Sequence, residues 1–160
     1  MKKLIAFSFL CLLLLFLPLP SLAWEARVVG ITDGDTITVE SASGGDRVKI
    51  RLHGIDAPEL RQPYGQAAKS FLMSTVLFKK VDVQPTPQRT DRYGRVVAIV
   101  KVPDVGILQE LLLERGLAWI HPKYCKNCSD WEVLQLQAQN QQRGLWIESQ
   151  PISPWEWRKM

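Results

Sequence analysis

Three carboxylates and two arginines, spread over about sixty residues, are of the types that phosphodiester hydrolysis needs. Asp35, Asp56 and Glu59 offer acidic oxygens, and Arg51 and Arg95 offer permanent positive charge. Such a reaction needs carboxylates that hold a cation, fixed positive charges around the negative charge that develops, and a base for the attacking water. The sequence therefore contains the parts of a metal-dependent phosphodiesterase site.

Asp35 and Asp56 are the candidate metal ligands, each beside a predicted strand. Two carboxylates with one backbone carbonyl make an incomplete oxygen cage, which water and a substrate phosphate would complete. Oxygen ligands of this kind suit Ca²⁺ and also Mg²⁺. Taken singly, both segments have a structural interpretation, because Asp33-Gly34 is a hairpin turn signal and Pro58 suits a helix start.

The two arginines are candidates for binding phosphate. A guanidinium can bind two phosphate oxygens at once, which a lysine ammonium cannot do. Glu59 lies three residues after Asp56, within reach of the same cation, where it would act as general base or orient the water. Each of these side chains taken alone is also compatible with an ordinary solvated surface position.

The first half of the chain predicts a three-stranded meander that positions these residues. The runs 27–31 and 36–39 are rich in β-branched residues and flank the Asp33-Gly34 turn. A third strand over 48–52 follows Gly44-Gly45-Asp46. Its apolar residues alternate with polar ones, which directs Arg51 away from the core.

The second half alternates helices with strands. The apolar spacing predicts a helix over 67–77, a strand over 81–84, a strand over 96–102 and a helix over 107–115 that stops at Gly116. Pro85 and Pro87 are expected to end the strand before them and to open a polar loop through Tyr93-Gly94. A last helix is predicted from Ser129, with Ser129 and Glu132 as a capping box, to Gly144. Five strands and three helices indicate an α+β fold, mainly β, with mostly antiparallel neighbours in a small barrel.

Residues 1–23 have the pattern of a secretory signal peptide, with Lys2 and Lys3, an apolar run and a small-residue site ending at Ala23. Cleavage there would leave residues 24–160, a length that suits one domain. It would also lower the formal net charge from +4 by the two lysines to +2, so a nucleic-acid site must be a local patch. We expect an exported protein, periplasmic or extracellular, with no membrane span after cleavage.

Five segments follow one another in a characteristic order: Asp33-Gly34-Asp35-Thr36, the segment Arg51 to Glu59, Asp91-Arg92-Tyr93-Gly94-Arg95, and the endings Gly144-Leu145-Trp146 and Pro154-Trp155-Glu156-Trp157-Arg158. Together they resemble the micrococcal, or staphylococcal, nuclease family. The resemblance covers essentially all of residues 24–160, and it implies a five-stranded OB-fold barrel with three flanking helices. It also implies calcium-dependent cleavage of DNA and RNA that leaves 3′-phosphate ends, by a monomer without a stable protein partner.

The matching motif positions imply roles for individual residues. Asp35 and Asp56 resemble the calcium carboxylates, with Ala57 lending its backbone carbonyl oxygen. Arg51 and Arg95 resemble the arginines that bind the phosphate, and Glu59 resembles the proposed base. The remaining implied positions are Asp33 and Thr36 as support for the metal ligands, Arg92 and Tyr93 beside the substrate phosphate, and Trp119 and Tyr124 as candidates for base stacking.

The chain departs from the best-known member of the family at two places near the expected site. That member has threonine where this chain has Ala57, so a hydroxyl near the metal is absent and the preference between Ca²⁺ and Mg²⁺ stays open. The segment 60–64 is also shorter than the corresponding loop. Substrate preference and the position of the base are expected to shift with it.

Cys125 and Cys128 are the two cysteines left after removal of Cys11 with the signal peptide. A disulfide that closes a short loop before the last helix is the preferred interpretation, ahead of free thiols or a partial zinc site with His121. The main alternative function is a noncatalytic OB-fold module that binds nucleic acid. A thiol–disulfide protein built on Cys125 and Cys128 ranks far behind, since the helix-start setting of reactive cysteines is missing.

Overall fold

A computed structural model describes residues 23–41, 44–126 and 128–160. The predicted signal segment lies outside these residues except for Ala23, so its cleavage stays a prediction. In the described part of the chain, no helix combines the length and the apolar character that crossing a membrane requires.

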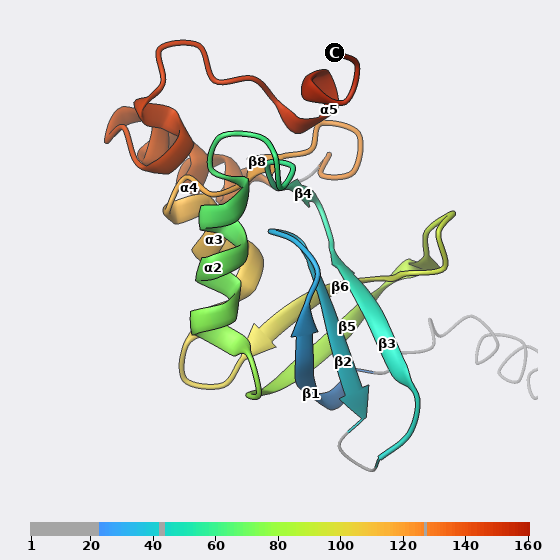
Figure 1. Ribbon diagram of the computed structural model, residues 1–160. Helices are drawn as coiled ribbons and strands as arrows, with labels where there is room; N and C mark the ends of the chain where they lie inside the picture. The colour runs from blue at the N-terminus through green and yellow to red at the C-terminus, as the bar shows by residue number, and fades with distance from the viewer. Residues whose placement is uncertain (1–22, 42–43, 127) are drawn as a thin grey trace, which may run out of the picture.

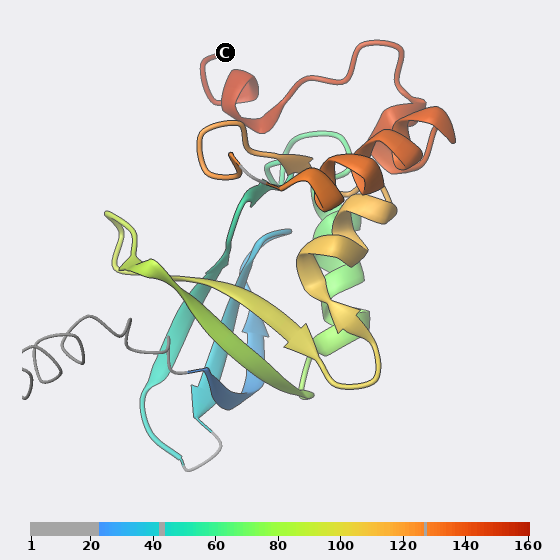
Figure 2. The same ribbon diagram turned by 180° about the vertical axis from the view of Figure 1, so that it is seen from behind.

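Five strands close into a barrel, which confirms the predicted fold class (Figures 1 and 2). Their order around the barrel is β3-β2-β1-β5-β6, and a parallel pairing between β3 and β6 closes the ring. The other neighbouring pairs are antiparallel. The strands are β1 (Trp24–Ile31), β2 (Thr36–Ser41), β3 (Arg47–Leu52), β5 (Lys80–Thr90) and β6 (Val96–Val102).

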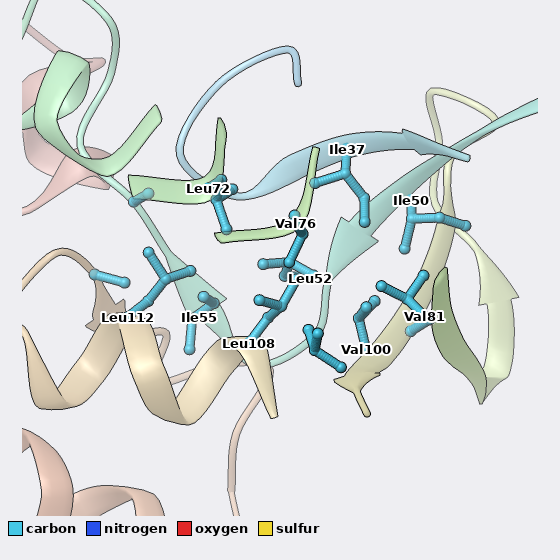
Figure 3. Packing of buried hydrophobic residues seen from close by; sticks show 14 of the residues in the cluster. Ile37, Ile50, Leu52, Ile55, Leu72, Val76, Val81, Val100, Leu108 and Leu112 are labelled. Atoms are coloured by element: carbon cyan, nitrogen blue, oxygen red, sulfur yellow. The ribbon is translucent and has the colours of Figure 1, made fainter. Parts of the chain in front are cut away.

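The core fills the space between the barrel and two helices, α2 (Gly65–Val76) and α3 (Leu108–Glu114) (Figure 3). Alternate strand residues point inward, as the period of two requires. Helix α2 buries residues four positions apart, which is the amphipathic spacing read from the sequence. The fully buried residues of these elements include Ile37, Ile50, Ala68, Leu72, Val76, Val81, Val100, Leu108 and Leu112.

One polar side chain fastens α3 to the barrel. Gln109 is fully buried; its Nε2 donates to the carbonyl oxygen of Ala98 at 2.9 Å, and its Oε1 accepts from the N–H of Val100 at 3.3 Å. Both ends of the amide are therefore satisfied, as a buried polar group requires. The contact fixes the helix against β6.

The prediction that Pro85 and Pro87 end the fourth barrel strand is wrong. Strand β5 continues to Thr90, with a register irregularity between Pro85 and Thr90. Pro87 lies within this irregular stretch of the β5–β6 pairing. Proline is tolerated at a β-bulge, because the ladder of hydrogen bonds is already interrupted there.

The last long helix, α4 (Ser129–Asn140), starts where predicted but without the predicted capping box. Cys128 occupies the N-cap position and makes no side-chain cap hydrogen bond. Ser129 is therefore the first helical residue, and its side chain stands one position too late to cap. The helix also ends before Gly144, which instead begins the 3₁₀ helix η2 (Gly144–Ile147).

Three of four further short elements lie together at one end of the molecule (Figures 1 and 2). Strands β4 (Ile55–Asp56) and β8 (Trp119–Ile120) pair with each other, while β7 (Gly106–Ile107) extends the barrel sheet beside β6. Helix α5 (Pro154–Trp157) lies at the same end as β4 and β8 in both views (Figures 1 and 2). The C-terminal tail is thereby brought to the segment that carries Asp56.

Candidate active site

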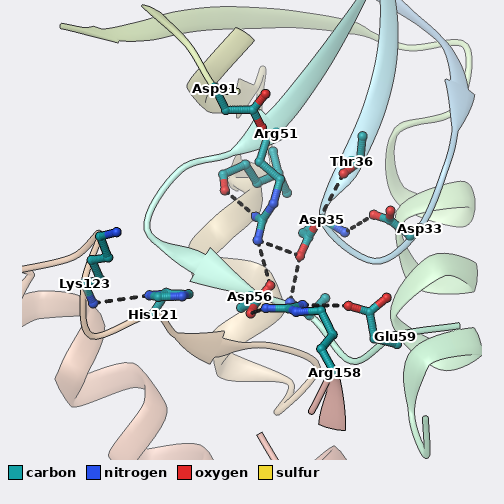
Figure 4. Close-up of polar contacts among 12 residues, drawn as sticks. Asp33, Asp35, Thr36, Arg51, Asp56, Glu59, Asp91, His121, Lys123 and Arg158 are labelled. Carbon is teal, nitrogen blue, oxygen red and sulfur yellow. Dashed lines mark hydrogen bonds and ion pairs between the residues drawn. The ribbon is translucent and has the colours of Figure 1, made fainter. Parts of the chain in front are cut away.

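Asp35 and Asp56 converge on one point, although they belong to separate segments (Figure 4). Asp35 precedes β2, and Asp56 ends β4. Nη2 of Arg51 lies 3.1 Å from Oδ2 of Asp35 and 2.8 Å from Oδ1 of Asp56. The two carboxylate side chains are only 9% and 4% exposed, so this is a buried charge cluster in which one guanidinium serves two acids.

Gly34 makes this approach possible. A Cβ atom at Gly34 would stand 2.7 Å from the Cβ atoms of both Ala57 and Ala68, which is too close for any side chain. The turn therefore packs directly against the Asp56-Ala57 segment and α2. Across this contact the N–H of Ala57 donates to Oδ2 of Asp35 at 2.8 Å.

Asp33 and Thr36 orient the Asp35 carboxylate from its own turn. Oδ1 of Asp33 accepts the N–H of Asp35 at 3.0 Å, and the Thr36 hydroxyl donates to Oδ1 of Asp35 at 3.1 Å. Both residues thus contact Asp35, and their support of a metal ligand stays a prediction. Burial, with the neighbouring negative charge of Asp35, raises the pKa of Asp33 to about 6.

We expect Asp33→Asn to stabilise the protein at pH 8 in the presence of a chelator, by roughly 1–3 kcal/mol. The pKa of Asp33 is higher in the folded protein than in the unfolded chain, so the folded state binds the proton more tightly. The free energy of unfolding of the parent therefore falls as the pH rises from about 4 to about 6. Asparagine removes this loss, while its amide oxygen can still accept the N–H of Asp35.

Urea unfolding of the parent and of Asp33→Asn at pH 4 and pH 8 measures the effect. The gain should be present at pH 8 and absent at pH 4. The exposed Asp46 provides the matched control Asp46→Asn, which should change neither value by a comparable amount. An equal gain from Asp33→Asn at both pH values would contradict the assignment.

Arg95 is held toward the carboxylates by its own turn. Oδ1 of Asp91 accepts the N–H groups of Tyr93 and Arg95, and Oδ2 accepts Nε of Arg95 at 2.8 Å. Burial alone would raise the pKa of Asp91, but these hydrogen bonds from Arg95 and Tyr93 lower it below its usual value. Nη1 of Arg95 then donates to the Thr36 hydroxyl at 3.2 Å, which links Arg95 to Asp35 through one side chain.

Arg92 and Tyr93 form the outer edge of this turn. Nη2 of Arg92 donates to the Tyr93 hydroxyl at 2.6 Å. The guanidinium carbons of Arg92 and Arg95 lie 4.7 Å and 5.4 Å from the centroid of the Tyr93 ring. Both Arg92 and Tyr93 are exposed, so they lie beside Arg95 on the surface. Their contact with a substrate phosphate stays a prediction.

Glu59 reaches the same cluster through an arginine that the sequence reasoning did not assign to the site. Nη1 of Arg158 lies 2.6 Å from Oε1 of Glu59, and Nη2 lies 2.7 Å from Oδ2 of Asp56 (Figure 4). A pocket of about 390 Å³ opens at this point, lined by Asp33, Glu59, Leu60, Arg61, Trp157 and Arg158. The signal for Arg158 was the ending Trp155-Glu156-Trp157-Arg158, which contributed to the resemblance without an assigned role.

The donor set fits a hard divalent cation. Among the residues that the structure describes, no group of three or more His, Cys, Asp or Glu side chains is placed to hold a metal ion. A cation at this point would therefore have two carboxylates, from Asp35 and Asp56, with other oxygens to complete its shell. Both carboxylates already share one positive charge from Arg51, which shows that they face a common point. Calcium and magnesium both accept such oxygens.

Trp119 is the partner of Asp56 in the pairing of β4 with β8, but its ring packs against other aromatic side chains. The Trp119 ring packs edge-on against Trp146 and Trp155, with ring centroids 4.3 Å and 5.8 Å away, and lines a pocket of about 220 Å³ with Pro58 and Trp157. Tyr124 is exposed beside His121. Base stacking by Trp119 and Tyr124 stays a prediction. Cys125 and Cys128 are joined by a disulfide, so neither thiolate is available for a zinc site with His121.

Comparison with known proteins identifies related sequences over most of the chain. The family described as "Staphylococcal nuclease homologue" matches residues 49–148. An "Uncharacterized endonuclease" of Escherichia coli is 40% identical over 134 residues, which cover 84% of each chain. One of the same description from Haemophilus influenzae is 36% identical, over 92% of this chain and 82% of its own. A "Micrococcal nuclease" of Shigella flexneri is 32% identical, over 86% and 83%.

Proposed function

This chain belongs to the staphylococcal nuclease family, and from this premise we propose that it hydrolyses phosphodiester bonds of DNA and RNA with a calcium ion held by Asp35 and Asp56. The relatives support an enzyme that acts on nucleic acids. We propose the calcium dependence, the ends produced and the roles of the individual residues on the grounds that follow.

Asp35, Asp56 and the backbone carbonyl of Ala57 are the proposed ligands. When bound there, calcium supplies positive charge that polarises the phosphate and favours ionisation of water. Magnesium is the alternative ion, because the same oxygens accept it. The burial of both carboxylates supports this assignment, since charge interactions are stronger where water is excluded.

Arg51 and Arg95 are proposed to bind the phosphate oxygens. Arg95 keeps Asp91 as its partner and presents Nη1 toward Thr36, so it stands at the edge of the carboxylate cluster. Arg51 would exchange its carboxylate partners for phosphate oxygens when a cation neutralises Asp35 and Asp56. Two fixed guanidinium groups around the phosphate stabilise the additional negative charge of the transition state. Arg92 and Tyr93 are proposed to flank the same phosphate.

Glu59 is the proposed general base. Its carboxylate is 42% exposed and borders the open pocket beside Asp33 and Arg158, so water and substrate can reach it. Glu59 would take the proton of the water that attacks phosphorus, and the 5′ oxygen would leave, which gives the expected 3′-phosphate ends.

A single observation carries the choice of an enzyme over a noncatalytic binding module. The carboxylates of Asp35, Asp56 and Glu59 and the guanidinium groups of Arg51 and Arg95 lie in one connected network. Binding of a nucleic-acid backbone needs the positive charges alone. Buried carboxylates at a phosphate site repel the ligand unless a cation joins them, and their presence therefore favours metal-dependent hydrolysis.

The deciding experiment is hydrolysis of single-stranded DNA and of RNA by the purified protein with calcium, with magnesium and with a chelator. We expect cleavage of both substrates with calcium and loss of at least about 100-fold of the rate in chelator. End-group analysis should find 3′-phosphates. Absence of cleavage with either metal, while a folded protein still binds the oligonucleotides, would reassign it to the binding modules.

Two further proposals concern where the protein works and in what form. The pattern of residues 1–23 supports export to the periplasm or the medium after cleavage. A monomer is proposed, because the site is assembled from segments of one chain.

A further inference from the structure

Arg158 contacts two acids of the site, although it lies near the C-terminal end of the chain. It is separated by 102 residues from Asp56 and by 99 from Glu59. One planar guanidinium donates to both, at 2.7 Å and 2.6 Å (Figure 4). Charge-assisted hydrogen bonds of this length are among the strongest that side chains make. The Arg158 guanidinium therefore connects Asp56, the proposed metal ligand, with Glu59, the proposed base.

Arg158 also determines how the Asp56 carboxylate is used. Oδ2 of Asp56 accepts from Arg158, whereas Oδ1 accepts from Arg51, the residue whose Nη2 also contacts Asp35. The bond to Arg158 thus leaves Oδ1 turned toward Asp35, where the cation is proposed to bind. A carboxylate held at one oxygen by a hydrogen bond is a fixed ligand through the other.

The tail that carries Arg158 is anchored by contacts of its own. Gln62 is buried; its Nε2 donates to the carbonyl oxygen of Ile152 at 2.6 Å, and its Oε1 accepts the N–H of Glu59 at 3.1 Å. The Ser153 hydroxyl, also buried, donates to Oε2 of Glu156 at 2.6 Å. Trp155 packs against Trp119. Helix α5 is therefore docked independently of Arg158, and it presents the guanidinium to the acids.

The contact with Arg158 restrains the conformation of the Glu59 side chain. It is 42% exposed on the turn between β4 and α2, and an exposed glutamate loses considerable rotamer freedom when it is fixed. Its backbone is held by Gln62, and its carboxylate is held by Arg158. Arg158 belongs to the C-terminal tail, and Gln62 also contacts the tail through Ile152.

We propose that Arg158 is a positioning residue of the nuclease site, which fixes the Glu59 carboxylate for its reaction with water and makes the tail Ile152–Arg158 part of the active site. This inference rests on the proposed function. Arg158 acts through Glu59 and Asp56 and does not itself have to touch the substrate. A base misplaced by about 1 Å loses on the order of 100-fold in rate, so Arg158→Gln is expected to lower kcat about 10- to 100-fold.

The test compares Arg158→Gln, Arg158→Lys and Glu59→Gln in the full chain, at calcium and substrate concentrations that saturate each variant. We expect Arg158→Gln to lower kcat with KM within about threefold of the parent. Arg158→Lys should recover part of the loss, because an ammonium keeps the charge but has no planar fork. Lys159→Gln removes the same charge one position further on and is the matched control, expected to keep parental kcat.

A double-mutant cycle identifies the residue through which Arg158 acts. If Arg158 works through Glu59, adding Arg158→Gln to Glu59→Gln should lower kcat by less than about threefold further. A full additional loss in that background would overturn the inference, as would an unchanged or raised kcat in Arg158→Gln. If the unfolding temperature of Arg158→Gln falls below the assay temperature, the same cycle is run with Arg158→Lys. Absence of calcium-dependent cleavage by the parent would instead reject the proposed function.

Discussion

Glu59→Gln is expected to lower kcat on single-stranded DNA at least about 100-fold. Glutamine has nearly the same shape, and its amide oxygen can still accept from Arg158, but it cannot take the proton of the attacking water. The side chain is 42% exposed and lies outside the core. The thermal unfolding temperature should therefore stay close to that of the parent.

Steady-state kinetics at saturating calcium, with thermal unfolding of the same preparations, measures this result. The exposed Glu132 of α4 provides the control Glu132→Gln, which changes charge equally but stands away from the carboxylate cluster. A Glu59→Gln protein with parental kcat would remove Glu59 from the role of base. The metal-binding proposal would survive that outcome, because it rests on Asp35 and Asp56.

Arg51→Met is expected to combine a loss of activity with a loss of stability that calcium reverses in part. We expect kcat to fall about 10²–10³-fold, as for removal of one preorganised donor to a transition state. In chelator the variant should lose about 3 kcal/mol of stability, since Asp35 and Asp56 lose a shared buried partner. Methionine keeps much of the apolar stem, so the loss reports chiefly on the charge.

Calcium should raise the unfolding temperature of Arg51→Met by more than it raises that of the parent. In the parent a cation must displace Arg51 from the two carboxylates, whereas in the variant this competing guanidinium is gone. A cation that binds only the folded state stabilises it. The exposed Arg47 at the start of the same strand provides the control Arg47→Met. An equal effect of calcium on both proteins would contradict a shared site for Arg51 and the cation.

The residues proposed for chemistry were found in the sequence because their signals are local. Asp33-Gly34 marked a turn, and the alternation through β3 placed Arg51 on the polar face. Asp91 to Arg95 formed a compact motif, whose turn the Asp91 carboxylate holds through three hydrogen bonds. The structure brings Asp35, Arg51 and Asp56 into direct contact. Their catalytic roles stay predictions until they are measured.

Local sequence signals gave a wrong prediction at two places. Pro85 and Pro87 are strand breakers in isolation, yet β5 continues past them to Thr90, with an irregular register toward β6 in this stretch. Ser129 and Glu132 have the spacing of a capping box, yet the helix begins one residue earlier than a Ser129 cap requires. The pairing of the whole strand decided the first case, and the exact start of the helix decided the second.

The sequence by itself determined the set of acids and arginines, the five strands with their inward residues, and the family. These features depend on residue types and on short spacings along the sequence, which are the same in the folded and the unfolded chain. Only the tertiary structure decided that β3 closes the barrel against β6 and that Arg158 joins Asp56 and Glu59. Contacts across about a hundred residues have no local pattern, because packing of the whole domain fixes them.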